Sequence, residues 1–327
     1  MGHDWLLVET LGAEPAVAAT GREPVNLVPI SGFLRRNPHV MAVLAAIGES
    51  VRSGQGLSTI TPMTDRVIRT EVVTMTDGRV HGVHVWIGPP DDEPPARPIP
   101  GALTWNLTTG IATHTPESLA NAGHDPHTDP PVGRIFLEQL PPRGLTTGEA
   151  RLLAMVVNPQ PGKTVVTTWA GTDQTGQPIA EGFVARSVLH TAEDGRDEVI
   201  CRAMNWRADP EVPAVDDEVA APQVADNMAG PGCHRLLIDI DNWRVLKWLD
   251  APPAFLDLNA RGRGDQTVHP DDAREMARMT MEFVDGYTSG VLRLRSVDGG
   301  WSPVRLTVHR VELDEDTYAG IVSLRPA

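Results

Sequence analysis

The chain has 327 residues, of which 41% are hydrophobic and 22% charged, a composition typical of a folded globular protein. It carries 43 acidic against 28 basic side chains, giving a formal net charge of −15, so nucleic acid is a poor partner because phosphate binding needs clustered Lys and Arg. No apolar run approaches the roughly 18 residues of a membrane-spanning helix, and the first residues do not resemble a signal peptide. We therefore expect a cytoplasmic protein without a membrane span.

Two segments divide the chain into three pieces. Residues 89–100 carry six prolines, which stiffen the backbone and prevent a regular helix or central strand. Residues 208–230 are acidic and also contain proline, as expected for a solvated linker. The pieces on either side, 1–88, 101–207 and 231–327, each have the length of a small domain.

The first piece predicts strands at 5–10 and 16–20. Residues 38–53 place apolar side chains at the 3.6-residue spacing of an amphipathic helix. Asp77-Gly78, which lies between apolar runs, predicts a β-hairpin, since Gly accepts the positive φ of a tight turn.

The second piece repeats this plan, with strands predicted at 103–107 and 111–113, a helix at 147–157 and a hairpin at Asp194-Gly195. The third piece predicts strands at 235–240 and 243–248, a helix that begins near Pro270, and a hairpin at Asp298-Gly299. We therefore expect an α+β protein of three tandem domains, each an antiparallel sheet with helices packed on one face.

The third piece resembles the second half of a PAS domain. The resemblance rests on the order of five segments: TVHPDD at 267–272, GVLRLR at 290–295, DGGW at 298–301, VRLTV at 304–308 and AGIVSL at 319–324. The first piece is similar to a PAS domain more loosely, and the second resembles either a GAF or a PAS domain.

The whole chain, from HDWLLVETLG at 3–12 through CRAMNW at 201–206, resembles a mycobacterial family of PAS–GAF–PAS tandem sensor proteins that lack an output domain. The resemblance implies ligand sensing or signalling without a catalytic step, and it supplies no binding residues.

Aromatic side chains gather in the third piece and form a candidate small-molecule pocket, with core packing as the alternative explanation. They are Trp243, Trp248, Phe255, Phe283, Tyr287 and Trp301. Trp86 and Trp206 end the last strands of the first two pieces, and His84 shares a strand face with Trp86, so we expect these three to be buried against a neighbouring domain.

No motif predicts catalytic residues or a metal centre, and no residue identifies a cofactor. His124, His127 and Asp129 have side chains that suit a divalent metal, but they lie in a Pro-containing loop. The expected function is non-enzymatic sensing that is relayed to an unidentified signalling protein. Two alternatives remain open, an interaction scaffold with no ligand and a metal-assisted hydrolase, and a homodimer is also left open.

Overall fold

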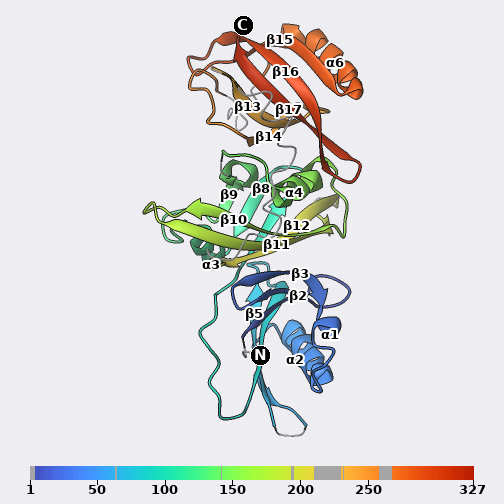
Figure 1. Ribbon diagram of the computed structural model, residues 1–327, viewed down its shortest axis with the longest axis vertical. Coiled ribbons are helices and arrows are strands. Elements are labelled where there is room, and N and C mark those ends of the chain that lie inside the picture. The colour runs from blue at the N-terminus through green and yellow to red at the C-terminus, as the bar shows by residue number, and fades with distance from the viewer. Residues whose placement is uncertain are drawn as a thin grey trace. The chain divides into compact units, whose positions relative to one another are not determined.

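The computed structural model describes residues 4–62, 65–140, 142–192, 195–209, 230, 232–257 and 267–327. These residues form three antiparallel sheets (Figure 1). The chain divides into two compact units, one containing residues 1–136 and 159–217 and the other containing residues 137–158 and 218–327. Within the described ranges, no helix has both the length and the apolar character to cross a bilayer.

The N-terminal sheet has the strand order β3-β2-β1-β6-β5-β4. Its strands are β1 (Leu6–Glu9), β2 (Ala16–Thr20), β3 (Glu23–Pro29), β4 (Ser58–Ile60), β5 (Val67–Thr74) and β6 (Val80–Gly88). The helices are α1 (Ile30–Phe33) and α2 (Val40–Ser53). Val43 and Ile47 of α2 share a buried cluster with Val8, Val83 and Val85 of the sheet, as the helical spacing predicts.

The middle sheet has the order β10-β11-β12-β7-β8-β9. Its strands are β7 (Gly101–Asn106), β8 (Ile111–His114), β9 (Val132–Ile135), β10 (Thr164–Thr172), β11 (Pro178–Thr191) and β12 (Asp197–Arg207). The helical elements of this sequence region are α3 (Pro116–Asn121), η1 (Phe136–Gln139) and α4 (Thr147–Val157). Asp194 of the predicted hairpin lies outside the described residues, but the strands on either side of it do pair, from Thr191 with Asp197 onward.

The C-terminal sheet has the order β14-β13-β17-β16-β15. Its strands are β13 (His234–Asp239), β14 (Arg244–Trp248), β15 (Tyr287–Arg295), β16 (Trp301–Asp314) and β17 (Thr317–Pro326). The helical elements are η3 (Pro270–Asp272), α6 (Ala273–Glu282) and η4 (Phe283–Asp285). The predicted hairpin is present between β15 and β16, where Gly299 adopts a φ of 84°.

One strand order runs through all three sheets. In the N-terminal and middle sheets, counted within each, the order is third, second, first, sixth, fifth and fourth. The C-terminal sheet has the same order without the third strand. The chain therefore repeats one folding plan three times, as the positions of its turns predict.

The N-terminal and middle sheets belong to the same unit and share a buried hydrophobic cluster. Leu7 and Val73 come from the first sheet, and Val184, Met204 and Trp206 come from the second.

Polar contacts accompany this cluster. Arg186 Nε donates to Glu9 Oε1 at 2.8 Å, and Arg202 Nη2 donates to Asp77 Oδ2 at 2.6 Å. Each of these pairs joins a residue of the middle sheet to one of the N-terminal region.

Helix α4 is the main departure from the expected domain organisation. Its sequence lies inside the predicted middle domain, yet it belongs to the same compact unit as the C-terminal sheet and contacts β16 and β17. Side chains from α6 pack on Leu236 of β13, and Glu149 of α4 reaches Lys247 of β14, which pairs with Leu237. Since neighbouring residues on a strand point to opposite faces, these contacts of Leu236 and Lys247 lie on opposite sides of the two strands.

Candidate ligand-binding site

The C-terminal unit contains a cavity of about 430 Å³. It is bounded by strands of the C-terminal sheet and by the segment that leads into α6, from Thr267 to Met276. Its walls are mainly aliphatic and include Leu236, Ile238, Val245, Leu294, Leu306 and Leu324. The cavity is therefore an apolar space inside one unit.

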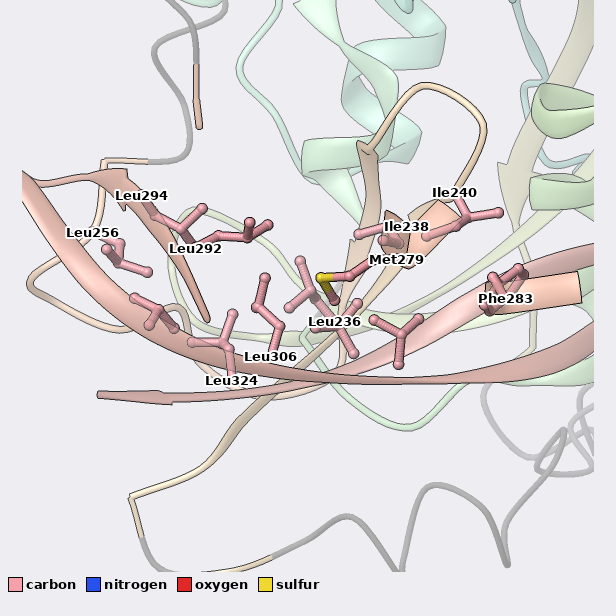
Figure 2. Close-up of a cluster of buried hydrophobic side chains, with 13 residues drawn as sticks. Leu236, Ile238, Ile240, Leu256, Met279, Phe283, Leu292, Leu294, Leu306 and Leu324 are labelled. Atoms are coloured by element: carbon pink, nitrogen blue, oxygen red, sulfur yellow. The ribbon is translucent and has the colours of Figure 1, made fainter. Parts of the chain in front are cut away.

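Strand alternation places these aliphatic side chains on one face of the sheet. Leu236 and Ile238 are two residues apart in β13, and Leu294 and Leu306 also point toward the same cluster. Met279 of α6 packs against this face and is fully buried (Figure 2). The strand pattern and the helix together thus create the apolar wall.

Polar side chains line the cavity at Asn242, Thr267 and His269. His269 Nδ1 accepts a hydrogen bond from the backbone N–H of Asp271 at 3.2 Å. A neutral His269 with this bond carries its proton on Nε2, which leaves Nε2 as a donor. The cavity can therefore offer a hydrogen bond to one polar end of an otherwise apolar molecule.

An ion pair fixes the segment that carries His269. Arg293 of β15 donates from Nη2 to Asp272 Oδ1 at 2.6 Å, and its backbone N–H donates to Asp272 Oδ2 at 2.8 Å. These hydrogen bonds from Arg293 lower the pKa of Asp272. The backbone N–H of His269 also donates to the carbonyl of Arg293 at 2.9 Å, so the polar lining of the cavity is held to the sheet.

Trp243 has an unusual backbone conformation at the cavity wall. Its φ is +56°, a region that bulky side chains rarely adopt and that costs of order 1–3 kcal/mol. Its indole Nε1 donates to Thr280 Oγ1 at 2.9 Å, and Thr280 donates to the Met276 carbonyl at 3.0 Å. Trp243 therefore joins the turn between β13 and β14 to α6 while also lining the cavity.

Of the six predicted pocket aromatics, Trp243 lines the cavity directly. Trp248 and Phe255 pack against the adjoining hydrophobic cluster, and Phe283 is buried within it. The structure thus brings four of the six to one apolar region, mostly as packing around the cavity.

Tyr287 and Trp301 are not among the residues that line this cavity. Tyr287 is 49% exposed because its neighbour Thr288 takes the inward position on β15. Trp301 pairs with Arg295 across the strands, and its ring lies 4.9 Å from that of His269. It therefore contacts a lining residue without lining the cavity itself.

Sequence reasoning missed the aliphatic walls and the polar lining. The alternation of Val304, Leu306 and Val308 predicts an inward face, but nothing in the pattern separates a cavity wall from a filled core. His269 stands in the segment that resembles a PAS domain, which was the available signal for a functional role.

The three residues expected to be buried against a neighbouring domain are all nearly inaccessible to solvent. Trp206 lies in the cluster shared by the N-terminal and middle sheets, and its Nε1 donates to the Arg22 carbonyl at 3.2 Å. His84 Nδ1 lies 3.2 Å from Arg97 Nη1, so the Pro-rich segment reaches it. Trp86 packs beside Gly88, with the Arg69 guanidinium 5.8 Å from its ring.

The loop that suggested a metal site is organised around an arginine. Arg134 Nη1 lies 3.3 Å from Asp129 Oδ1, and Arg134 Nη2 lies 3.1 Å from His124 Nε2. The positive charge of a guanidinium in this position would repel a divalent cation. Across the residues that the structure describes, no group of three or more His, Cys, Asp or Glu could hold a metal ion.

Comparisons with known proteins place the whole chain in one family. Residues 4–96, 99–208 and 218–327 match the family models "Rv3651-like, N-terminal", "Rv3651-like, middle domain" and "Rv3651-like, C-terminal domain". The crystal structure of an uncharacterized protein from Mycobacterium tuberculosis is similar, with 51% sequence identity and a TM-score of 0.80. That match covers 100% of this chain and 97% of the other.

Other similarities are weak. A sensory box histidine kinase/response regulator from Burkholderia thailandensis has 15% identity over 39% of this chain and 82% of its own, with a TM-score of 0.23. An RNA-binding light-oxygen-voltage receptor has 9% identity over 70% of this chain and 95% of its own, with a TM-score of 0.24. Similarities at this level support no functional conclusion.

A search among curated proteins finds no match. The family matches do not identify the three domains as PAS, GAF and PAS domains. The chain belongs to the Rv3651-like family.

Proposed function

We propose that this chain is a non-enzymatic, cytoplasmic sensor whose C-terminal domain binds a small, mostly apolar molecule and relays that binding to a protein partner. The cavity of about 430 Å³ carries this proposal. Its volume is within the range of about 300–1,000 Å³ typical of small-molecule sites, and its apolar walls with few polar groups are typical too. The repeated strand order and the PAS-like segments support a tandem sensor of PAS/GAF-like domains.

Trp243 connects the cavity to helix α6. It lines the cavity, and its indole Nε1 donates a hydrogen bond to Thr280 of α6, so a ligand that shifts the indole would also change this hydrogen bond. The next helical residue, Met281, is 76% exposed, so α6 presents one side to solvent. A ligand that favours one position of α6 would change partner affinity about 5–150-fold for a coupling of 1–3 kcal/mol.

The cavity chemistry supports binding in preference to catalysis. His269 is the single ionisable side chain among the described residues that line it. Nucleophilic catalysis needs a nucleophile beside a general base, and the nearby Asp272 is already held by Arg293. A scaffold without a ligand remains the competing function.

A probe titration with two methionine variants of α6 tests the proposal. Met276 lines the cavity, whereas Met281 lies on the exposed side of the same helix. We expect the neutral fluorescent probe N-phenyl-1-naphthylamine to bind the full chain. Met276→Trp should weaken binding about tenfold or more by filling the cavity, which corresponds to at least about 1.4 kcal/mol.

The matched variant Met281→Trp should bind like the unchanged protein, because it adds the same indole outside the cavity. Thermal unfolding would confirm that both variants fold. Equal binding by the two variants would overturn the assigned site. Absence of binding by the unchanged protein would favour the scaffold.

A further inference from the structure

A second cavity, of about 840 Å³, lies in the N-terminal domain. Leu6, Val85 and Ile87 provide an apolar floor from the sheet. Phe33, the last residue of α1, and the connection to α2 also line it, and the Phe33 side chain is 39% exposed. Because this cavity is lined by residues of the N-terminal domain, it shares no lining residue with the C-terminal cavity.

The lining of this cavity is cationic in a chain that is acidic as a whole. Arg35, Arg36 and Arg66 border it, against two acids, Asp4 and Asp65. Arg35 and Arg36 are exposed, and within the described ranges neither has a carboxylate within salt-bridge distance. The two guanidiniums are thus available to an anion from solution.

One of the two acids is already engaged within the domain. Asp65 Oδ2 lies 3.3 Å from His39 Nε2, and Asp65 Oδ1 accepts a hydrogen bond from Thr61 at 2.9 Å. Its carboxylate is therefore less available to Arg35 and Arg36. The cavity also meets the start of α2, whose first turn contains no acidic side chain to compensate the positive end of the helix dipole.

We propose that the N-terminal cavity binds an amphipathic carboxylate. The aliphatic chain would lie on Leu6, Val85 and Ile87, and the carboxylate would pair with Arg35 and Arg36. Guanidinium suits this role because its planar donors match a carboxylate in two parallel hydrogen bonds. The net charge of −15 disfavours an anionic membrane as the source, so the ligand is a free molecule.

Dodecanoate is the test ligand, measured by displacement of dansylated undecanoate from the full chain. The titration is made in the Met276→Trp background, which removes the C-terminal cavity from the measurement. We expect Arg35→Gln/Arg36→Gln to weaken dodecanoate binding about tenfold or more, because hydrogen bonds to a charged group are among the strong ones. Phe33→Ala should weaken binding while leaving the charge unchanged.

Two controls separate charge from apolar contact. Arg52→Gln removes an exposed arginine of α2 that pairs with Glu49 outside the cavity lining, so it should not change the affinity. Dodecanol has the same aliphatic chain without the carboxylate, so its affinity should be at least about tenfold lower.

Three results would overturn the proposal. They are full affinity in the Arg35/Arg36 double variant, equal affinity for dodecanol and dodecanoate, and no dodecanoate binding at all. Co-sedimentation with anionic phospholipid vesicles that is lost in the double variant would instead assign the arginines to a membrane. Each result is independent of whether the C-terminal cavity binds its own probe.

Discussion

Lys247 Nζ lies 3.1 Å from Glu149 Oε1, and both side chains are almost completely buried. The pair joins β14 of the C-terminal sheet to α4, which stands almost a hundred residues earlier in the chain. Glu149 also accepts from the backbone N–H of Thr146 at 3.1 Å as part of a capping box. One carboxylate thus begins the helix and ties it to the sheet, while burial lowers the pKa of Lys247.

Removing one member of this pair should strongly destabilise the C-terminal unit. Lys247→Met removes the buried ammonium from Glu149 and leaves it with the partly exposed Arg143, whose Nη2 lies 3.4 Å from Oε1. Breaking a buried pair costs up to about 3–5 kcal/mol. Replacing both residues, as Lys247→Met/Glu149→Leu, should recover much of the loss, because no buried charge remains unpaired. Urea unfolding of the two single variants and the double variant measures the coupling.

Arg52→Gln is the control, since Arg52 pairs with Glu49 on the exposed surface of α2. Its stability should stay close to that of the unchanged protein, because exposed ion pairs contribute little. Simple additivity of the Lys247 and Glu149 variants would show that the two side chains do not interact.

Buried histidines should make the protein less stable as the pH falls from 7 to 5. Burial lowers the pKa of His81 and of His114 to about 4 each and that of His84 to about 3. In the unfolded chain these pKa values are near 6.5, so below that pH the unfolded state binds protons that the folded state does not. Each histidine then removes up to about 1.4 kcal/mol of stability per pH unit.

His81→Gln tests this prediction at one of the three buried histidines. His81 Nδ1 donates to the Ala203 carbonyl at 2.9 Å, and its Nε2 lies 3.1 Å from Arg202 Nη1. A Gln amide can both donate and accept, yet it does not titrate, so the slope of stability against pH should become shallower by one proton. An unchanged slope in His81→Gln would contradict the assignment.

A single added methyl group should disturb the cluster around Trp206. Gly182 of β11 is the cross-strand partner of Trp206, and a Cβ at this position would lie 2.3 Å from Trp206 Cε2. We expect Gly182→Ala to destabilise the unit by about 1–3 kcal/mol through overpacking.

Gly171→Ala is the control in the same sheet, since the nearest atom to its added Cβ is Ile179 Cγ1 at 3.7 Å. Denaturant unfolding that shows equal effects for Gly171→Ala and Gly182→Ala would argue against close packing at Trp206.

Much of the local structure could be predicted because its signals are local. Residues 147–157 were expected to be helical and form α4 with the same bounds, since Thr146 and Glu149 build the capping box at its start. The strand predicted at 16–20 is β2, and the Asp298-Gly299 turn is present because Gly299 accepts a positive φ. These turns also predicted that the neighbouring strands pair in antiparallel sheets.

The structural features that could not be predicted depend on contacts between residues far apart in the chain. Nothing in residues 147–157 shows that Glu149 reaches Lys247 and joins the C-terminal unit. β3, with Pro24 and Pro29, gave no strand signal because proline removes backbone donors, yet it pairs at the sheet edge.

The candidate site could likewise be predicted only in part. Of the aromatic residues predicted from composition, Trp243 lines the C-terminal cavity. The remaining walls are aliphatic, and their separation into cavity and filled core depends on how strands and α6 pack. That arrangement has no signature in the order of the residues.

Hydrogen–deuterium exchange of the full chain, with and without N-phenyl-1-naphthylamine, tests most directly whether the C-terminal cavity binds a small apolar molecule. We expect the probe to slow exchange in β13, in β14 and in α6, where Trp243 and Thr280 connect the cavity to the helix. We expect no change in the strands of the middle sheet. Unchanged exchange in these C-terminal elements at saturating probe, or protection confined to the other domains, would contradict the proposed binding.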